Sequence, residues 1–274
     1  MSEKLVNNEP DMQRRFGGVR RLYGERGLAS FQAAHVCVIG IGGVGSWAAE
    51  ALARNAIGRI TLIDLDNIAE SNVNRQLHAI EGEFGRAKVT AMAERIRAIN
   101  PSCQVREIED FITPVNVEIL LAVGFHAVLD AIDDARAKVA IAAYCRQHKI
   151  PLVMTGGAGG RLDPTWIRTD DLAKVAGDRL LAKVRNSLRR DHGFPKAPAA
   201  KKIQTRFGIS CVYSDEPVQK PQNDQTSCEV DSAVTGLNCA GYGSSVCVTA
   251  PFGMAAAALV LNILQKNIMH SSDG

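Results

Sequence analysis

Residues 35–46 read HVCVIGIGGVGS, and this stretch decides the fold class of the 274-residue chain. Its first five residues form a short apolar run rich in β-branched side chains, which predicts a buried strand. Glycines follow in the GxGxxG spacing at Gly40, Gly42 and Gly45. Residues 47–55 (WAAEALARN) have the composition of a helix, and residues 59–63 (RITLI) predict a second strand. This order of elements predicts a βαβ unit with a glycine turn.

The same alternation continues along the chain. Further strands are predicted at 103–108, 127–130 and 151–155, and helices at 16–31, 85–99, 135–148 and 171–190. Strands that alternate with helices predict an α/β fold with a doubly wound, mainly parallel sheet of the Rossmann-like kind. We assign residues 1–170 to the core of this fold, which the motifs described below identify as an ATP-binding adenylating core. Residues 171–274 are predicted to add a basic helix and loop segment and the C-terminal strands and helix that complete the same domain.

Composition excludes several classes of protein. A hydrophobic content of 46% with 22% charged residues is typical of a globular chain. The aromatic content of 5% argues against an RNA surface built mainly on stacked rings. The seven cysteines are scattered and form no CxxC pair, and the first fifteen residues are polar. These features favour a reduced, cytoplasmic protein without a four-thiolate zinc site.

Residues 246–264 (VCVTAPFGMAAAALVLNIL) are almost wholly apolar and about long enough to span a bilayer. We expect Pro251 and Gly253 to break the helix early, which leaves a run too short to span. A buried core helix is therefore favoured, and membrane contact is the alternative.

Polar residues that follow the predicted strands indicate a nucleotide site. The glycine turn lets the backbone approach a phosphate at a helix N-terminus, and Asp64 is placed to bind ribose hydroxyls. These features suit NAD as well as ATP. Arg75 and Lys88 add cations for a polyphosphate, and Asp133 adds a hard carboxylate for magnesium. A dinucleotide enzyme needs none of these three, so the pattern favours adenylation. Solvated surface charge and a helix N-cap are the plainer alternatives.

The runs GIGGVGS, DLD, SNVNRQ, GRAK and DAIDD together resemble the ThiF/MoeB/HesA superfamily of ubiquitin-activating-type adenylating enzymes. This resemblance covers about residues 16–160. The opening RRFGGVRRLYGERGL, the run KIPLVMTGGAGGRLDPT and the tail NCAGYGSSVCVTAPFG resemble one subfamily, the tRNA threonylcarbamoyladenosine dehydratases.

The resemblance implies a role for each motif. Arg75, Lys88 and Asp133 would be catalytic, with Asp133 holding magnesium. The ATP site would be lined by Gly40, Gly42, Gly43, Gly45, Asp64, Asp66, Asn72 and Gln76. A monovalent cation, sodium or potassium, is a further implied ligand.

The same resemblance implies partners. The substrate would be a tRNA that carries threonylcarbamoyladenosine beside the anticodon, and the enzyme would be a homodimer. An arginine from the partner's N-terminal segment would reach the site; Gly18 aligns with it, and Arg14, Arg15, Arg20 and Arg21 are alternatives. A cysteine desulfurase sulfur-transfer system is also implied as a partner. Cys239 is a candidate thiol, although a structural free cysteine is favoured.

A basic segment supports the RNA interpretation. Residues 174–206 contain ten Lys or Arg and two Asp or Glu, a net charge of +8, so the rest of the chain carries −5 of the total of +3. A polyanion requires such a surface. The candidates are Lys183, Arg185, Arg189, Arg190, Lys201 and Lys202. A solvated basic helix is the alternative.

Three other functions compete with this interpretation. The runner-up is adenylation of the C-terminal glycine of a small sulfur-carrier protein, against which the missing CxxC pairs count. An NAD-dependent oxidoreductase and a non-catalytic partner of a sulfur-transfer complex are the others. His35 and His78 are assigned to packing or to the surface.

Overall fold

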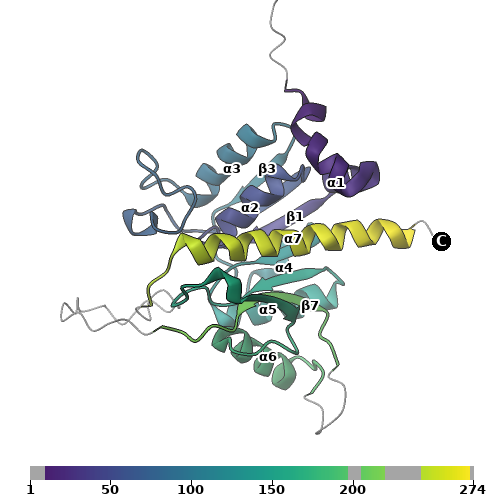
Figure 1. Cartoon of the computed structure of the whole chain (residues 1–274). Coiled ribbons are helices and arrows are strands. Elements are labelled where there is room, and N and C mark those ends of the chain that lie inside the picture. Colours follow the sequence, from purple (N-terminus) through teal and green to yellow (C-terminus); the bar gives the residue numbers. More distant parts are fainter. Residues whose placement is uncertain (1–9, 197–204, 220–241, 272–274) are drawn as a thin grey trace, which may run out of the picture.

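The computed structural model describes residues 10–196, 205–219 and 242–271 (Figure 1). Within these ranges the strands form one seven-stranded sheet in the order β3-β2-β1-β4-β5-β7-β6. The strands are β1 (His35–Ile39), β2 (Arg59–Ile63), β3 (Gln104–Ile108), β4 (Ala127–Asp130), β5 (Leu152–Thr155), β6 (Ile167–Asp171) and β7 (Ile209–Ser214). Neighbouring strands are parallel except β6 and β7. The predicted doubly wound, mainly parallel sheet is confirmed.

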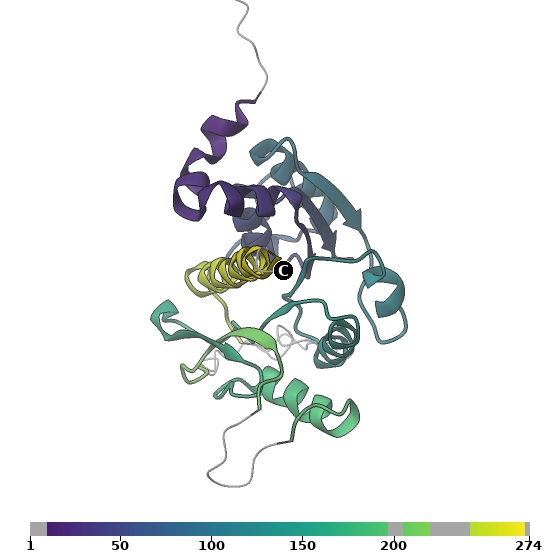
Figure 2. The ribbon, with the colours of Figure 1, turned by 90° about the vertical axis from the view of Figure 1, so that its right-hand side faces the viewer.

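Helices cover both faces of the sheet, as Figures 1 and 2 show. They are α1 (Met12–Ala33), α2 (Gly45–Arg54), α3 (Lys88–Ile99), α4 (Val117–Leu121), α5 (Ala135–Gln147), α6 (Arg179–Asp191) and α7 (Val246–Ser271), with short 3-10 turns η1 (Glu70–Asn72) and η2 (Pro164–Trp166). Alternate residues of a strand pack into two hydrophobic cores, one on each face of the sheet. Val36 and Val38 pack with α1, α2, α3 and α7, whereas Cys37 and Ile39 pack with α4, α5 and α6.

The order of the strands fixes where the site lies. β1 pairs with β2 on one side and with β4 on the other, and Ile39 is in register with both Ile63 and Asp130. The chain therefore leaves β1 toward one half of the sheet and later returns to the other half. A crevice forms at the carboxyl ends of the strands at such a switch point. The segments that begin with Gly40, Asp64 and Ala131 meet there.

The basic segment begins differently from the predicted helix over 171–190. Asp171 ends strand β6, and its carboxylate accepts hydrogen bonds from the N–H groups of Phe207 and Gly208 at 2.8 Å. Helix α6 begins only at Arg179, because Asp178 caps it by accepting from the Leu181 N–H at 2.8 Å. The helical prediction for residues 171–178 was therefore wrong, since side-chain capping placed the helix start later.

Helix α7 contradicts the expected break at Pro251 and Gly253. It runs unbroken over 26 residues. The N–H that Pro251 lacks would have bonded to the carbonyl of the exposed residue Cys247 near the start of the helix, where water can reach that carbonyl. Gly253 allows close packing, since a Cβ there would lie 2.4 Å from the Val44 oxygen.

Because α7 is unbroken, its length does not exclude membrane insertion. The packing of α7 inside the domain is what distinguishes a core helix from a membrane helix. Over Val246–Lys266 the helix is long and apolar enough to cross a membrane, and 44% of the most apolar window is buried inside the domain. Its buried residues, including Val248, Phe252, Val260 and Leu264, belong to the core that α1, α2 and α3 share. This arrangement matches a core helix.

Candidate nucleotide site

The glycine turn between β1 and α2 requires glycine at two positions. Gly40 has φ of +83°, and a Cβ there would lie 2.8 Å from Ile132 Cγ2. A Cβ on Gly45 would lie 1.7 Å from the Gly40 oxygen. Helix α2 begins at Gly45, and no side chain caps its N-terminus. This turn has the form of a phosphate-binding helix N-terminus.

Asp64 holds the glycine turn in place from the end of β2. Its Oδ2 accepts the Ile41 N–H at 2.6 Å, and its Oδ1 accepts the Asp66 N–H at 2.9 Å. Burial raises the pKa of this carboxyl, and the positive charge of Lys88 and the two backbone hydrogen bonds oppose that effect. Asp64 lies at the switch point, where the sequence predicted a ribose ligand.

Lys88 begins α3 and lies beside the same turn. Its ammonium forms an ion pair with Asp66 Oδ2 at 2.7 Å. Its backbone N–H donates to the main-chain carbonyl oxygen of Asp66 at 3.1 Å. A short antiparallel bridge between Asn67 and Ala87 reinforces this pairing. The DLD and GRAK motifs, whose Asp66 and Lys88 are 22 residues apart along the chain, therefore form one structural unit.

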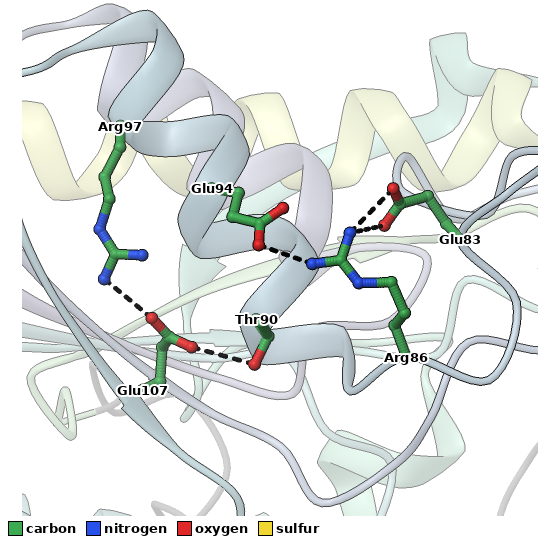
Figure 3. Close-up of polar contacts among 6 residues, drawn as sticks. All are labelled: Glu83, Arg86, Thr90, Glu94, Arg97 and Glu107. Carbon is green, nitrogen blue, oxygen red and sulfur yellow. Dashed lines mark hydrogen bonds and ion pairs between the residues drawn. The ribbon is translucent and has the colours of Figure 1, made fainter.

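A network of charged side chains anchors the segment before Lys88 (Figure 3). Arg86 donates to both carboxylate oxygens of Glu83, at 2.9 and 2.7 Å, and to Glu94 on α3 at 2.6 Å. Farther along the helix, Arg97 pairs with Glu107 of β3 at 2.8 Å. Arg86 thus joins the loop that carries GRAK to the helix that Lys88 begins.

Arg75 lies across the glycine turn. Its Cγ is 3.1 Å from the position of a Cβ on Gly43, and its guanidinium donates to the Ser71 oxygen at 2.8 Å and to Asn74 Oδ1 at 2.9 Å. Burial lowers the pKa of Arg75 from its very high ordinary value, and the group stays a cation at neutral pH. Trp47 of α2 also donates to the Arg75 oxygen at 3.0 Å. Arg75 is therefore held at the phosphate-binding turn.

Two buried amide side chains lie beneath this turn. Asn72 Oδ1 accepts the Ala69 N–H at 3.0 Å, which closes the 3-10 turn η1. Gln76 Nε2 lies 3.9 Å from the position of a Cβ on Gly42, and Gln76 Oε1 has no hydrogen-bond partner within the described ranges. The predicted roles of Asn72 and Gln76 in ATP binding stay predictions.

Asp133 is the third predicted catalytic residue. It lies half-buried in the loop between β4 and α5, where Ala131 donates to the Ile39 oxygen at 2.8 Å. Asp134, its neighbour, is the N-cap of α5. The structure therefore assigns the cap to Asp134, and Asp133 directly follows Ile132, whose Cγ2 packs against Gly40 of the glycine turn.

His78 is a residue whose role the sequence did not reveal. Burial lowers its pKa, so the ring is neutral, and Nε2 donates to the Ile41 oxygen at 2.8 Å. Ile41 is thus held by Asp64 at its N–H and by His78 at its carbonyl.

Asn74 is a second residue whose role the sequence did not reveal, and it joins the site to the start of α7. Its side-chain Nδ2 donates to the main-chain oxygen of Ser244 at 2.7 Å, and its main-chain carbonyl oxygen accepts the Val246 N–H at 3.0 Å. No motif in the sequence signals either contact.

The structure divides the RNA-binding candidates into two kinds. Lys183 and Arg190 are exposed on α6, and Arg190 pairs with Asp191 at 2.8 Å. Arg185 instead donates to the carbonyls of Leu172 and Val175, and Arg189 donates to the Pro195 oxygen. Lys201, Lys202 and Cys239 lie outside the described residues.

The arginines of helix α1 were predicted to approach the phosphate site of a partner subunit. Arg15 donates to the carbonyls of Ala98 and Ile99, at the end of α3 opposite to Lys88. That helix of 12 residues is about 18 Å long. Arg20 pairs with Glu25 at 3.3 Å, and Gly18 is exposed.

Comparison with known proteins agrees with this geometry. The model of the ThiF family matches residues 17–273. The chain belongs to the ThiF family. This ThiF-family chain is 51% identical over 253 residues to the tRNA threonylcarbamoyladenosine dehydratase of Escherichia coli (strain K12), which covers 91% of the chain and 92% of the relative. It is 46% identical to the Haemophilus influenzae protein of that name over 93% of the chain and 94% of the relative. The motif resemblance is confirmed.

Solved structures extend the comparison. The E. coli dehydratase in complex with ATP superimposes on the ThiF-family chain with a TM-score of 0.82 and 47% identity, over 94% of this chain and 96% of that one. By contrast, the molybdopterin-synthase adenylyltransferase of Salmonella typhimurium is 31% identical over 143 residues, 50% of this chain and 54% of the relative. The likeness to the dehydratases therefore runs through the whole chain.

Proposed function

We propose that this protein carries out the ATP-dependent dehydration of threonylcarbamoyladenosine in tRNA, next to the anticodon, by adenylating the threonyl carboxylate. The observation that carries the proposal is the meeting of the glycine turn with Asp64, Arg75, Lys88 and Asp133 at one switch point, in a chain similar over its whole length to dehydratases of that name. The glycine turn would bind phosphate, and the two cations would bind the polyphosphate.

The reaction takes two steps. The threonyl carboxylate attacks the α-phosphorus of ATP, and pyrophosphate leaves with its bonding electrons. A nitrogen or oxygen of the carbamoyl group in the same substituent then attacks the activated carbonyl, loses a proton, and expels AMP with one of the former carboxylate oxygens. The net change is the loss of one water from the nucleoside and the conversion of ATP to AMP and pyrophosphate. Proximity favours the second step, because nucleophile and electrophile share one side chain. Arg75 and Lys88 would stabilise the negative charge that develops on the phosphates.

Magnesium fits the residues at this site. Within the described ranges, no group of three or more His, Cys, Asp or Glu side chains is arranged to hold a metal ion alone. Magnesium commonly binds through one or two carboxylates together with substrate phosphates and water. Asp133 at the switch point provides such a carboxylate, and the ion would neutralise phosphate charge.

Three observations support the proposed partners and the proposed cytoplasmic location. Arg15 contacts the end of α3 opposite to Lys88, about one helix length away, so Arg15 does not reach the site of its own chain. This position agrees with the proposed homodimer, in which an arginine of the partner would reach the site. Exposed Lys183 and Arg190 support tRNA contact along α6. The described cysteines are free thiols, which supports a cytoplasmic location. The desulfurase partner and the monovalent cation stay predictions from the resemblance.

The test measures AMP formation by the purified protein with magnesium and tRNA, with or without threonylcarbamoyladenosine. AMP that forms only with the modified tRNA, together with a nucleoside lighter by one water in mass spectrometry, is the expected result. ATP binding without tRNA-dependent AMP would contradict the proposal, and adenylation of a sulfur-carrier protein would then be tested.

A further inference from the structure

A buried ion pair lies at the end of β4, just before the loop that carries the predicted magnesium ligand Asp133. Lys138 of α5 places its Nζ 2.9 Å from Asp130 Oδ1 at the end of β4, and both side chains have no exposed surface. Removing two charges from water is costly, and apolar residues of similar volume often give equal or greater stability. Stability alone therefore does not account for a lysine and an aspartate at these positions.

The pair fixes the first residues of the loop that follows β4. Asp130 Oδ1 accepts the Ile132 N–H at 3.1 Å in addition to the Lys138 ammonium. The Asp130 carbonyl accepts from Lys138 Nζ at 3.5 Å and from Thr155 Oγ1 of β5 at 3.4 Å. Helix α5 and strand β5 thus both hold the last residue of β4, and that residue holds Ile132.

The loop is held on its other sides as well. Ile132 packs against the glycine turn, since its Cγ2 lies 2.8 Å from the position of a Cβ on Gly40. At the far end, Asp134 accepts the N–H groups of Arg136 at 3.0 Å and Ala137 at 3.2 Å. Between these anchors lies Asp133, whose carboxylate has no hydrogen bond or ion pair to another described residue. The loop is therefore fixed around a carboxylate that is free to bind a ligand.

We propose that Lys138 and Asp130 are positioning residues for magnesium–ATP: the ion pair holds the carboxylate that fixes Ile132, and this fixed loop aims Asp133 into the crevice. The proposal rests on the proposed function and adds two residues that do not touch the nucleotide. The contact that fixes the loop is the hydrogen bond from the Ile132 N–H to Asp130 Oδ1. Lys138 supplies the positive charge and the hydrogen bond that the buried Asp130 carboxylate requires. A neutral side chain that accepts the same hydrogen bond should then replace the pair.

Two double variants separate positioning from simple burial. Asp130→Asn with Lys138→Met keeps an acceptor for the Ile132 N–H without either charge, whereas Asp130→Leu with Lys138→Met removes the acceptor. ATP binding to the full chain is measured by calorimetry with and without magnesium, and urea denaturation reports stability. The magnesium enhancement is the ratio of the ATP affinity with magnesium to that without it. We expect this ratio to stay within about twofold of the wild-type value in the asparagine variant and to fall about tenfold in the leucine variant, which should remain folded. Both should bind ATP alone like the wild type.

Asp133→Asn is the reference for complete loss of the magnesium enhancement, and the leucine change should add little on that background. A leucine variant with the wild-type enhancement, or an asparagine variant that loses it, would overturn the positioning role. If the leucine variant does not fold, Asp130→Ala with Lys138→Met takes its place, because alanine also lacks an acceptor for the Ile132 N–H. A wild type that binds ATP without any magnesium enhancement would overturn the magnesium assignment itself, a result distinct from failure of the positioning role alone.

Discussion

Lys88 Nζ lies 2.7 Å from Asp66 Oδ2, with the lysine side chain 6% exposed and the aspartate side chain 52% exposed. The aspartate therefore holds a nearly buried ammonium at the edge of the nucleotide site. A triphosphate offers that ammonium stronger acceptors than one exposed carboxylate. We therefore expect the ion pair to be a resting contact from which Lys88 turns to a phosphate when ATP binds.

We predict that Lys88→Ala lowers kcat for AMP formation by about 100-fold, because a charge-stabilising group is removed from the transition state. Asp66→Asn should change kcat by less than about fivefold, because the Asp66 side chain is half exposed and water screens its charge. Steady-state AMP release with the modified tRNA gives both values. Equal losses in the two variants would show that Asp66 itself takes part in catalysis.

The glycine turn gives a prediction about stability. Gly45→Ala should destabilise the fold by about 3–5 kcal/mol, because its Cβ would lie 1.7 Å from the Gly40 oxygen and the backbone must move. Gly42→Ala is the matched control: its Cβ would have only Gln76 Nε2 nearby, at 3.9 Å, so a change within about 1 kcal/mol is expected. Urea denaturation followed by circular dichroism measures both. A Gly45→Ala variant as stable as Gly42→Ala would show that the turn can relax.

Local patterns predicted most of the sheet and the glycine turn between β1 and α2. The apolar run before Gly40 and the polar residues after each strand carry their own signals, because strand, turn and helix N-terminus are set within a few residues. Arg75, Lys88 and Asp133 lie far apart in the sequence, and parallel strands bring them to one edge. Their convergence could therefore be inferred without coordinates.

Tertiary packing decided the features that the sequence did not reveal. Pro251 was expected to end a helix, but contact of α7 with the core maintains the helix through it. Lys138 appears in the sequence as an ordinary helix residue, and only the fold places it against Asp130. Arg185 counted as a basic surface residue, yet it binds carbonyls of its own domain. Contacts between elements distant in sequence have no periodic signature.

The network in Figure 3 predicts an indirect effect on nucleotide binding. Arg86→Ala frees the segment before Lys88 from Glu83 and Glu94 and should raise the KM for ATP about three- to tenfold, because Lys88 is less well positioned. Arg97→Ala is the control, since it removes a similar pair with Glu107 at the far end of α3. ATP titrations of AMP formation measure the two KM values. If both variants raise the KM alike, the effect belongs to α3 as a whole.

Acid stability should depend on Glu50 of α2, which pairs with Arg54 on the same helix and with Arg95 of α3, each at 2.7 Å. Burial opposes ionisation of this carboxyl, but the hydrogen bonds from Arg95 and Arg54 outweigh it and lower the pKa below its ordinary value of 4.5. The unfolded chain therefore binds the proton more tightly. Glu50 contributes stability above about pH 4.5, and that contribution disappears as pH falls through the lower folded pKa.

Glu50→Gln should cost about 1–3 kcal/mol at pH 7 and flatten the dependence of stability on pH below about 5. The exposed Glu109→Gln serves as the control, with no change in slope expected. Urea denaturation from about pH 3.5 to about pH 7, a window set by the usual carboxyl range, measures this dependence. An unchanged slope in Glu50→Gln would place the acid sensitivity in other carboxylates.

Substitution of two basic residues on α6 should affect different properties, tRNA binding for Lys183 and fold stability for Arg185. Lys183 is exposed, so Lys183→Ala should raise the KM for tRNA, leave ATP binding unchanged and reduce the slope of log KM against log salt by about 1. Arg185→Ala should instead destabilise the fold by about 1–3 kcal/mol, because the carbonyls of Leu172 and Val175 lose their donor. Salt titrations of tRNA-dependent AMP formation and urea denaturation of both variants separate the two effects. A Lys183→Ala variant with an unchanged salt slope would place the tRNA surface away from this face of α6, because a lysine that neutralises a phosphate releases counterions when the tRNA binds.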